Sequence, residues 1–220
     1  MVDSLLREVL QGRLRAGQHL VTRELADRFG VSHTPIREAL VAVAGLGVID
    51  LLPDRGAVVR RVTARDIHEI CQVRRALECE AVRAAAPRIR REELQALAGE
   101  LHCLAEAGPA DPRFVERARA SDNRLHDLIA ASCGNAFLAA ELARLKLLFR
   151  AFRDVAWEHE EARSDRSRVA EEAHEHLAIV EALLAGRPGE AVRAMERHIN
   201  AGARYWSRAV VRAGPPAAAA

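Results

Sequence analysis

The chain has 220 residues, of which 50% are hydrophobic and 4% aromatic, and its 33 basic and 31 acidic residues leave a formal net charge of +2. The high hydrophobic content and the nearly equal numbers of basic and acidic residues exclude a disordered polar tail. The lack of any apolar run of 18 residues excludes a membrane-spanning helix. With no secretory-signal pattern at the N-terminus, we expect a cytoplasmic protein of one or two domains, whose four cysteines are reduced and buried.

The excess positive charge lies in the first quarter of the chain. Residues 1–62 contain nine arginines and seven acidic residues, whereas residues 63–220 contain 24 basic and 24 acidic residues. A net charge of +2 is far below that of a strong non-specific nucleic-acid binder. If the first region binds DNA, its specificity must therefore depend on a few well-placed arginines.

Three short helices are predicted in residues 1–62. The first runs from about residue 4 to residue 11, the second begins after Thr22 as N-cap, and the third begins after Ser32 as N-cap. Pro35 lies in the first turn of the third helix, where its missing N–H costs nothing. The buried face of this helix is predicted from an i, i+3, i+4, i+7 pattern of apolar residues, namely Ile36, Ala39, Leu40 and Val43. Its other face carries His33, Arg37, Glu38 and Val41.

A two-stranded hairpin is predicted after the third helix. Residues 49–52 and 57–60 are strand-like, and Pro53-Asp54-Arg55-Gly56 is a turn sequence. Three helices followed by a hairpin indicate a winged helix-turn-helix, whose recognition helix presents one face to base edges. Arg37 is well placed for a bidentate contact with guanine, and Arg55 at the hairpin tip is placed to reach the DNA backbone or minor groove.

The sequences ELADRFGVSHTPIREAL and LLPDRGAVV resemble the DNA-binding signature of the GntR family of transcriptional regulators. The resemblance covers about residues 5–60 and implies that Arg23, residue 33 and Arg37 are the main DNA contacts, with the wing adding Arg55 and Gly56. The family usually has arginine at position 33, and the neutral imidazole of His33 makes a weaker contact. The complete predicted DNA-binding set is Arg23, Ser32, His33, Thr34, Arg37, Arg55 and Gly56.

An all-α antiparallel bundle is predicted for residues 63–212, which form a second domain after the head of residues 1–62. Six helices are expected, at about 65–86, 91–107, 112–132, 135–157, 167–185 and 189–210, separated by proline and glycine. Thr63 and Asp66 resemble a capping box at the start of the first of these helices. The low-complexity tail, residues 213–220, is expected to be disordered.

One aspartate and three histidines of this region form a candidate metal site. Asp122 and His126 are four residues apart, so they project from one face of one helix. His176 and His198 are equidistant from the turn at 186–189, so in an antiparallel helix pair they lie level with each other. Three imidazoles and a carboxylate suit zinc, which we favour, or nickel, manganese or iron.

The helical region also resembles the FCD effector domain that follows the winged helix in the FadR subfamily of GntR regulators. The matching sequences are VRRALECEAVRAAA, SDNRLHDLIAASCGN, EHLAIVEALLAGRPGEAV and MERHI. The resemblance implies that Asp122, His126, His176 and His198 bind the metal and that Arg74 pairs with the carboxylate of an effector. Asn135 is a further pocket candidate, although its Gly-Asn sequence also suits the start of a helix. Six helices indicate the VanR-like branch.

These features together predict a homodimeric transcription regulator that binds a palindromic operator in double-stranded DNA and responds to a small organic acid, with repression the favoured direction. The small number of aromatic residues favours a compact polar acid, with Phe137 among the expected pocket residues. One alternative is a regulator without metal, whose histidines contact the effector directly. Another is a bundle-type metalloenzyme, which is disfavoured because Glu171, Glu172 and Glu175 resemble solvated helix charges rather than a catalytic base.

Overall fold

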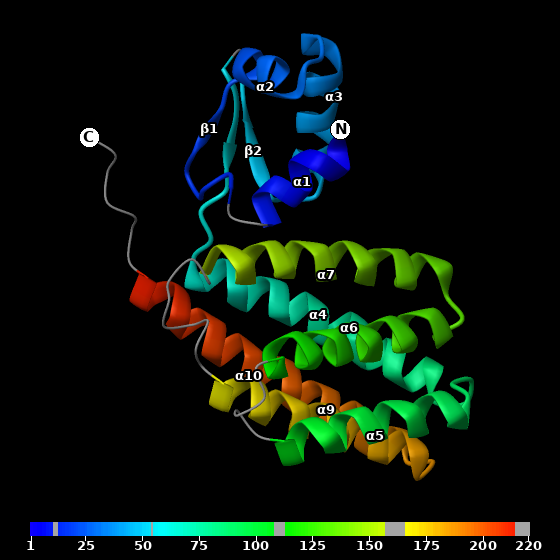
Figure 1. Cartoon of the computed structure of the whole chain (residues 1–220). Helices are drawn as coiled ribbons and strands as arrows, with labels where there is room; N and C mark the ends of the chain where they lie inside the picture. Colours follow the sequence, from blue (N-terminus) through cyan, green and yellow to red (C-terminus); the bar gives the residue numbers. More distant parts are fainter. Residues whose placement is uncertain (11–12, 54, 108–112, 157–165, 214–220) are drawn as a thin grey trace. The chain divides into compact units, whose positions relative to one another are not determined.

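The computed structural model describes residues 1–10, 13–53, 55–107, 113–156 and 166–213 (Figure 1). As predicted, the fold is mainly α-helical, with a small sheet near the N-terminus. The chain divides into two compact units, one comprising Met1–Ile67, Lys146–Ala162 and Trp206–Ala220, the other His68–Leu145 and Arg163–Tyr205. None of the described helices is long and apolar enough to cross a membrane. The predicted tail beyond residue 213 lies outside the described residues.

The N-terminal head is built around one central helix. Helix α3 (His33–Gly45) packs against α1 (Val2–Leu10) and α2 (Thr22–Phe29) and against the sheet. Its predicted buried face is confirmed, because Ile36, Ala39, Leu40 and Val43 are each at most 2% exposed. The turn between α2 and α3 passes through Gly30 in the left-handed conformation, with φ of 66°. Helix α2 begins at Thr22 itself, so the residue flanking it is Val21 and not the predicted Thr22 cap.

The sheet of the head has three strands, whereas the sequence predicted two. Strands β2 (Ile49–Leu52) and β3 (Gly56–Val59) form the expected hairpin, in which Leu52 pairs with Gly56. A third strand, β1 (His19–Leu20), pairs with the other edge of β3, giving the order β1-β3-β2. A strand of two residues shows no alternation of apolar and polar side chains, which is why the sequence pattern did not reveal it.

Six helices occupy the described part of the C-terminal region, as predicted. They are α4 (Ala64–Ala85), α5 (Arg91–Ala107), α6 (Phe114–Ser132), α7 (Ala136–Ala156), α9 (Arg166–Leu184) and α10 (Pro188–Ala213). Helix α5 packs against α6 and α9, and α6 also packs against α9. The predicted capping box is present at the start of α4, because the Asp66 N–H donates to the Thr63 hydroxyl and the Thr63 N–H donates to the Asp66 carboxylate.

The turn between α9 and α10 brings two distant histidines together. Gly186 adopts a φ of 66°, which reverses the chain between the two antiparallel helices (Figure 1). Ile179 and Leu183 on α9 and Met195 on α10 are all buried. His176 is only 2% and His198 only 6% exposed, so both imidazoles point into the interior of this unit.

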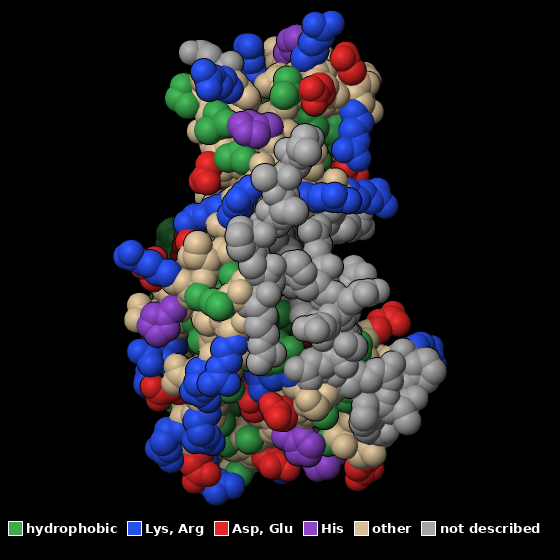
Figure 2. All heavy atoms as spheres, turned by 90° about the vertical axis from the view of Figure 1, so that its left-hand side faces the viewer, with side chains coloured by type: hydrophobic (Ala, Val, Ile, Leu, Met, Phe, Trp, Pro, Cys, Tyr) green, Lys and Arg blue, Asp and Glu red, His purple; other side chains and the backbone are tan. Residues whose placement is uncertain are grey.

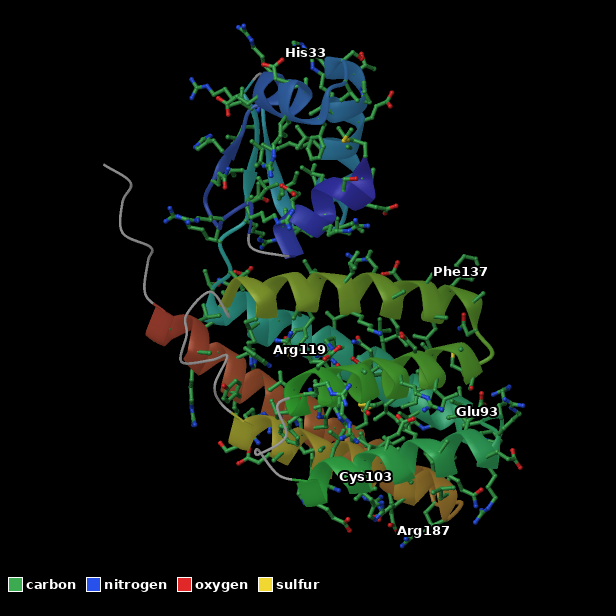
Figure 3. All side chains as sticks on the ribbon, in the orientation of Figure 1. His33, Glu93, Cys103, Arg119, Phe137 and Arg187 are labelled. Carbon is green, nitrogen blue, oxygen red and sulfur yellow. The ribbon has the colours of Figure 1, made fainter. Side chains whose placement is uncertain are left out.

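The four cysteines form no disulfide. Cys71 and Cys133 are buried and Cys79 is partly buried, but Cys103 is exposed. The expectation of four buried thiols is therefore wrong for Cys103, which lies on the solvent side of α5 (Figure 3).

Candidate metal centre and DNA-binding face

The predicted DNA-contacting side chains of α2 and α3 are exposed. Ser32 is the N-cap residue of α3, but its hydroxyl makes no capping hydrogen bond. His33 begins the same helix and projects from the end of the head (Figure 3). The remaining residues of this group that are open to solvent are Arg23, Thr34 and Arg37. The predicted side chains of the helix-turn-helix are thus exposed, and their contact with DNA stays a prediction.

The wing depends on Gly56 for its shape. Gly56 has a φ of +85°, and a Cβ atom at this position would lie 2.2 Å from the carbonyl oxygen of Leu20 in β1. Glycine is therefore required for β3 to approach β1. Arg55, which is exposed next to Gly56, lies at the hairpin tip. The structure thus gives Gly56 a backbone role that is independent of DNA, while Arg55 remains the predicted contact.

On the face shown in Figure 2, arginines and acidic side chains lie interspersed over the lower, helical part. This distribution agrees with the equal numbers of basic and acidic residues after residue 62. It gives this face no general affinity for the DNA backbone.

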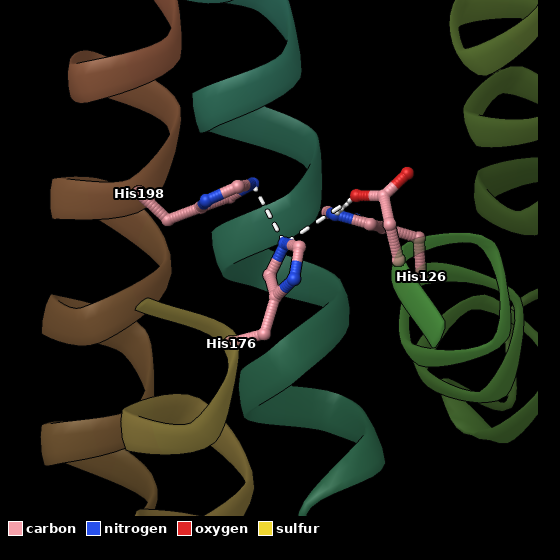
Figure 4. Close-up of side chains that lie close together, drawn as sticks. His126, His176 and His198 are labelled. Carbon is pink, nitrogen blue, oxygen red and sulfur yellow. Dashed lines mark hydrogen bonds and ion pairs between the residues drawn. The ribbon is translucent and has the colours of Figure 1, made fainter. Parts of the chain in front are cut away.

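The four predicted metal ligands lie together. Asp122 and His126 project from α6, His176 from α9 and His198 from α10, with α4 passing behind the three histidines (Figure 4). One ligand atom from each residue lies within 4.8 Å of those of the other three. This is the arrangement that the i, i+4 spacing and the level positions on antiparallel helices predicted.

Three of the distances between the ligand atoms are close to those found around a single ion. Nε2 of His176 lies 3.3 Å from Nε2 of His198 and 3.4 Å from Oδ1 of Asp122. Nε2 of His126 lies 3.5 Å from the same Asp122 oxygen. Atoms bound at about 2.0–2.1 Å to one ion lie about 3.0–3.4 Å apart at octahedral to tetrahedral angles. In addition, the buried Nε2 of His126 has no hydrogen-bond partner, so the residues present fit a divalent metal.

A buried series of ion pairs, from Arg74 through Glu78 on α4, supports His126. Nδ1 of His126 lies 2.6 Å from Oε2 of Glu78, whose other oxygen accepts a 2.7 Å hydrogen bond from Nε of Arg74. Glu78 is only 6% exposed. Glu78 was not among the predicted site residues, although its i, i+4 spacing from Arg74 was a usable signal for this ion pair.

A second series of side-chain contacts, from Arg168 through Glu175, supports His198. Nδ1 of His198 lies 2.8 Å from Oε2 of Glu175, and Arg168 donates two hydrogen bonds of 2.8 and 3.0 Å to the two oxygens of Glu175. The expectation that Glu175 is a solvated helix charge is therefore wrong, whereas Glu171 is exposed as expected. Because Glu175 faces the outer nitrogen of His198 and binds Arg168, it is not placed to act as a catalytic base.

Burial and the neighbouring charges shift the pKa values of His126, His176 and Glu175. Burial by itself would lower the pKa of His126, but the charges and hydrogen bonds of Glu78 and Asp122 together raise this pKa to about 9. Burial and the neighbouring His198 hold the pKa of His176 well below 6.5. Burial would raise the pKa of Glu175, but hydrogen bonds from His198 and Arg168 lower it to about 2. Without metal, His126 is therefore cationic at neutral pH, whereas His176 is a neutral imidazole with the electron pair that a metal ligand needs.

The predicted effector residues have different surroundings. Arg74 is part of the chain that reaches His126, and the charge of Asp122 also acts on it. Asn135 is exposed, and its side-chain oxygen accepts hydrogen bonds from the N–H groups of Phe137 and Leu138, so it caps α7. This agrees with the helix-start alternative for Asn135. Phe137, expected in the pocket, is 87% exposed and projects into solvent beside α7 (Figure 3), so that expectation is wrong.

Comparison with known proteins agrees with both halves of this description. Residues 1–59 match the model for bacterial regulatory proteins of the gntR family, and residues 69–201 match the model for the FCD domain. The chain belongs to the gntR family of regulators and carries an FCD domain. These proteins are transcriptional regulators and not enzymes.

Two relatives and one solved structure resemble almost the whole chain. A "Probable D-xylose utilization operon transcriptional repressor" of Paenarthrobacter nicotinovorans is 28% identical over 90% of this chain and 84% of its own length. The transcriptional repressor RspR of Escherichia coli K12 is 29% identical over 89% of this chain and 82% of its own. The structure of E. coli McbR/YncC, at 21% identity, has a TM-score of 0.72 and covers 94% of this chain and 95% of that one. The last similarity shows the shared fold.

Proposed function

We propose that this gntR-family regulator is a homodimeric repressor that acts in the cytoplasm on a palindromic operator. Two heads related by a two-fold axis bind two half-sites of matching symmetry. Arg37 reads a base edge in each half-site, and Arg23 and Arg55 contact the backbone. The names of two relatives, both repressors, support the direction of regulation.

The helical domain is proposed to hold a divalent metal ion, with zinc favoured and nickel, manganese or iron as alternatives. The observation that supports this is the convergence of Asp122 Oδ1 with the Nε2 atoms of His126, His176 and His198. Neutral imidazoles and carboxylates are ordinary ligands of these metals. Bound there, the ion supplies a positive charge that attracts a carboxylate.

The effector is proposed to be a small organic acid. Four protein ligands leave one or two positions of a five- or six-coordinate ion for its carboxylate. Arg74, within the electrostatic reach of Asp122, is the cation that orients the acid. The acid releases the operator only if it binds more tightly to the conformation with low DNA affinity.

A histidine pair on α9 provides the test of the metal site. His176 is buried in the cluster, whereas His174, two residues away, is exposed and bonds to the Ala170 carbonyl. Elemental analysis of protein purified without a histidine tag should find one metal per wild-type chain, the same for His174→Ala and much less for His176→Ala. Equal metal in the two variants would refute the ligand assignment.

The same measurement decides the alternative of a regulator without metal. The ion pairs of His126 with Glu78 and of His198 with Glu175 let this site stay folded without an ion, which is the observation that favours it. Wild-type protein that contains no metal and still binds organic acids would support this second function.

A further inference from the structure

Two arginine–glutamate–histidine chains flank the candidate metal centre from opposite sides. The first runs from Arg74 through Glu78 to Nδ1 of His126, and the second runs from Arg168 through Glu175 to Nδ1 of His198. In both chains the carboxylate contacts the nitrogen that faces away from the cluster. The Nε2 atoms of both histidines are thereby directed toward Asp122 and His176.

We propose that Glu78 and Glu175 are positioning residues that fix the tautomer and ring orientation of His126 and His198. The inference rests on the metal site proposed above and adds residues that do not touch the ion. A carboxylate at Nδ1 keeps the proton on that nitrogen, so the electron pair of a neutral ring lies on Nε2 and points into the site. It also increases the basicity of the ring, which strengthens its bond to a metal.

Arg168 and Arg74 fix the orientation of the two carboxylates relative to the histidines. Arg168 is only 6% exposed and donates to both oxygens of Glu175, which fixes the plane of that carboxylate. Arg74 donates to Oε1 of Glu78 and leaves Oε2 directed at His126. Each carboxylate, buried for Glu78 and partly exposed for Glu175, therefore has an arginine on the outside and an imidazole on the inside.

The chain contains a matched control for each positioning residue. Glu171 lies on α9, is 68% exposed and pairs with the same Arg168, but it contacts none of the three histidines. Glu80 lies on α4 next to the site and pairs with Arg83 in solvent. Substitution of these residues changes the same charge on the same helix without touching an imidazole.

The test measures zinc affinity of the full-length protein by competition with a chelator. Glu78→Gln and Glu175→Gln should each weaken zinc binding by about 10–100-fold at unchanged stoichiometry. Glu80→Gln and Glu171→Gln should bind zinc like the wild type. Wild-type affinity in Glu175→Gln, whose partly exposed site tolerates the amide, would overturn the proposal, even if Glu78→Gln failed to fold.

A second measurement does not need metal. In the proton NMR spectrum of metal-free protein, the Nδ1–H of His198 should give a low-field, slowly exchanging resonance because it is hydrogen-bonded to Glu175. Glu175→Gln should remove this resonance, and Glu171→Gln should keep it. If the wild type binds no zinc, the proposed metal function fails, and this resonance still decides whether Glu175 positions the ring. Its presence in Glu175→Gln would reject that role.

Discussion

The head and the helical domain place their candidate functional residues in opposite environments. In the head, Arg23, His33 and Arg37 are exposed. In the helical domain, His176 and His198 are buried, and the carboxylate of Glu175 that contacts His198 is itself held by Arg168. A solvated side chain contributes little to stability, whereas a buried charged group leaves its partner unpaired when it is removed. Substitution of a predicted DNA contact should therefore weaken DNA binding without lowering stability. Substitution of a candidate metal ligand, or of a residue that supports one, should also destabilise the fold.

The largest expected effect follows from removing a buried charge in the helical domain. Glu78→Ala leaves Arg74 and His126 buried without their shared carboxylate, so the free energy of unfolding should fall by about 3–5 kcal/mol. Glu80→Ala, on the exposed side of the same helix, should change it by less than about 0.5 kcal/mol. Urea denaturation of both variants checks this. If Glu78→Ala lowered the free energy of unfolding as little as Glu80→Ala does, the buried ion pairs of the helical domain would not contribute to its stability.

The next effect concerns a residue of the head that combines a backbone role with a predicted DNA role. Gly56→Ala places a Cβ atom 2.2 Å from Leu20 O at a φ of +85°. The left-handed conformation alone should cost about 1–2 kcal/mol, and the clash adds to it. Gly30→Ala has a similar φ of +66° but nothing within 4 Å of the new atom, so it isolates the conformational cost. Thermal unfolding should show a clearly larger loss for Gly56→Ala; equal losses would contradict the close approach of β1 and β3.

The recognition helix should show the separation of binding from folding. Arg37→Ala should weaken binding to an operator selected from random DNA by about 1–3 kcal/mol per half-site, because a bidentate base contact is lost. Its unfolding free energy should stay within about 0.5 kcal/mol of the wild type. Arg13→Ala, an exposed head arginine paired with Glu8, provides the control in the same gel-shift titration. Equal affinity of the two variants would remove Arg37 from the recognition surface.

The sequence predicted most of the fold because local patterns encode it. Apolar periodicity located α3 and its buried face, and Pro87, Gly134 and Gly186 marked breaks between C-terminal helices. Strand β1 was missed because it forms only through pairing with β3. The candidate metal ligands were predicted as two pairs, because i, i+4 spacing on one helix and symmetry about one turn are local relations.

The supporting carboxylates could not be predicted in the same way. Glu175 is adjacent to His176 in sequence but contacts His198 on the next helix. Glu78 on α4 reaches His126 on α6. These contacts depend on how the four helices α4, α6, α9 and α10 pack, and no spacing within one helix reveals them. The capping role of Asn135 was, by contrast, visible as an alternative, since asparagine at the start of a helix commonly serves as N-cap.

The smallest expected effect tests the head by adding a charge. His33→Arg restores the residue that the GntR signature usually has, and its side chain should gain one phosphate or guanine contact per subunit. Plots of log affinity against log salt concentration should become steeper by about one unit per added contact. His19→Arg adds the same charge to the exposed β1 and, away from the recognition helix, should leave the slope unchanged. If both variants steepen the slope equally, the gain is general electrostatic attraction, and position 33 has no special place in the DNA interface.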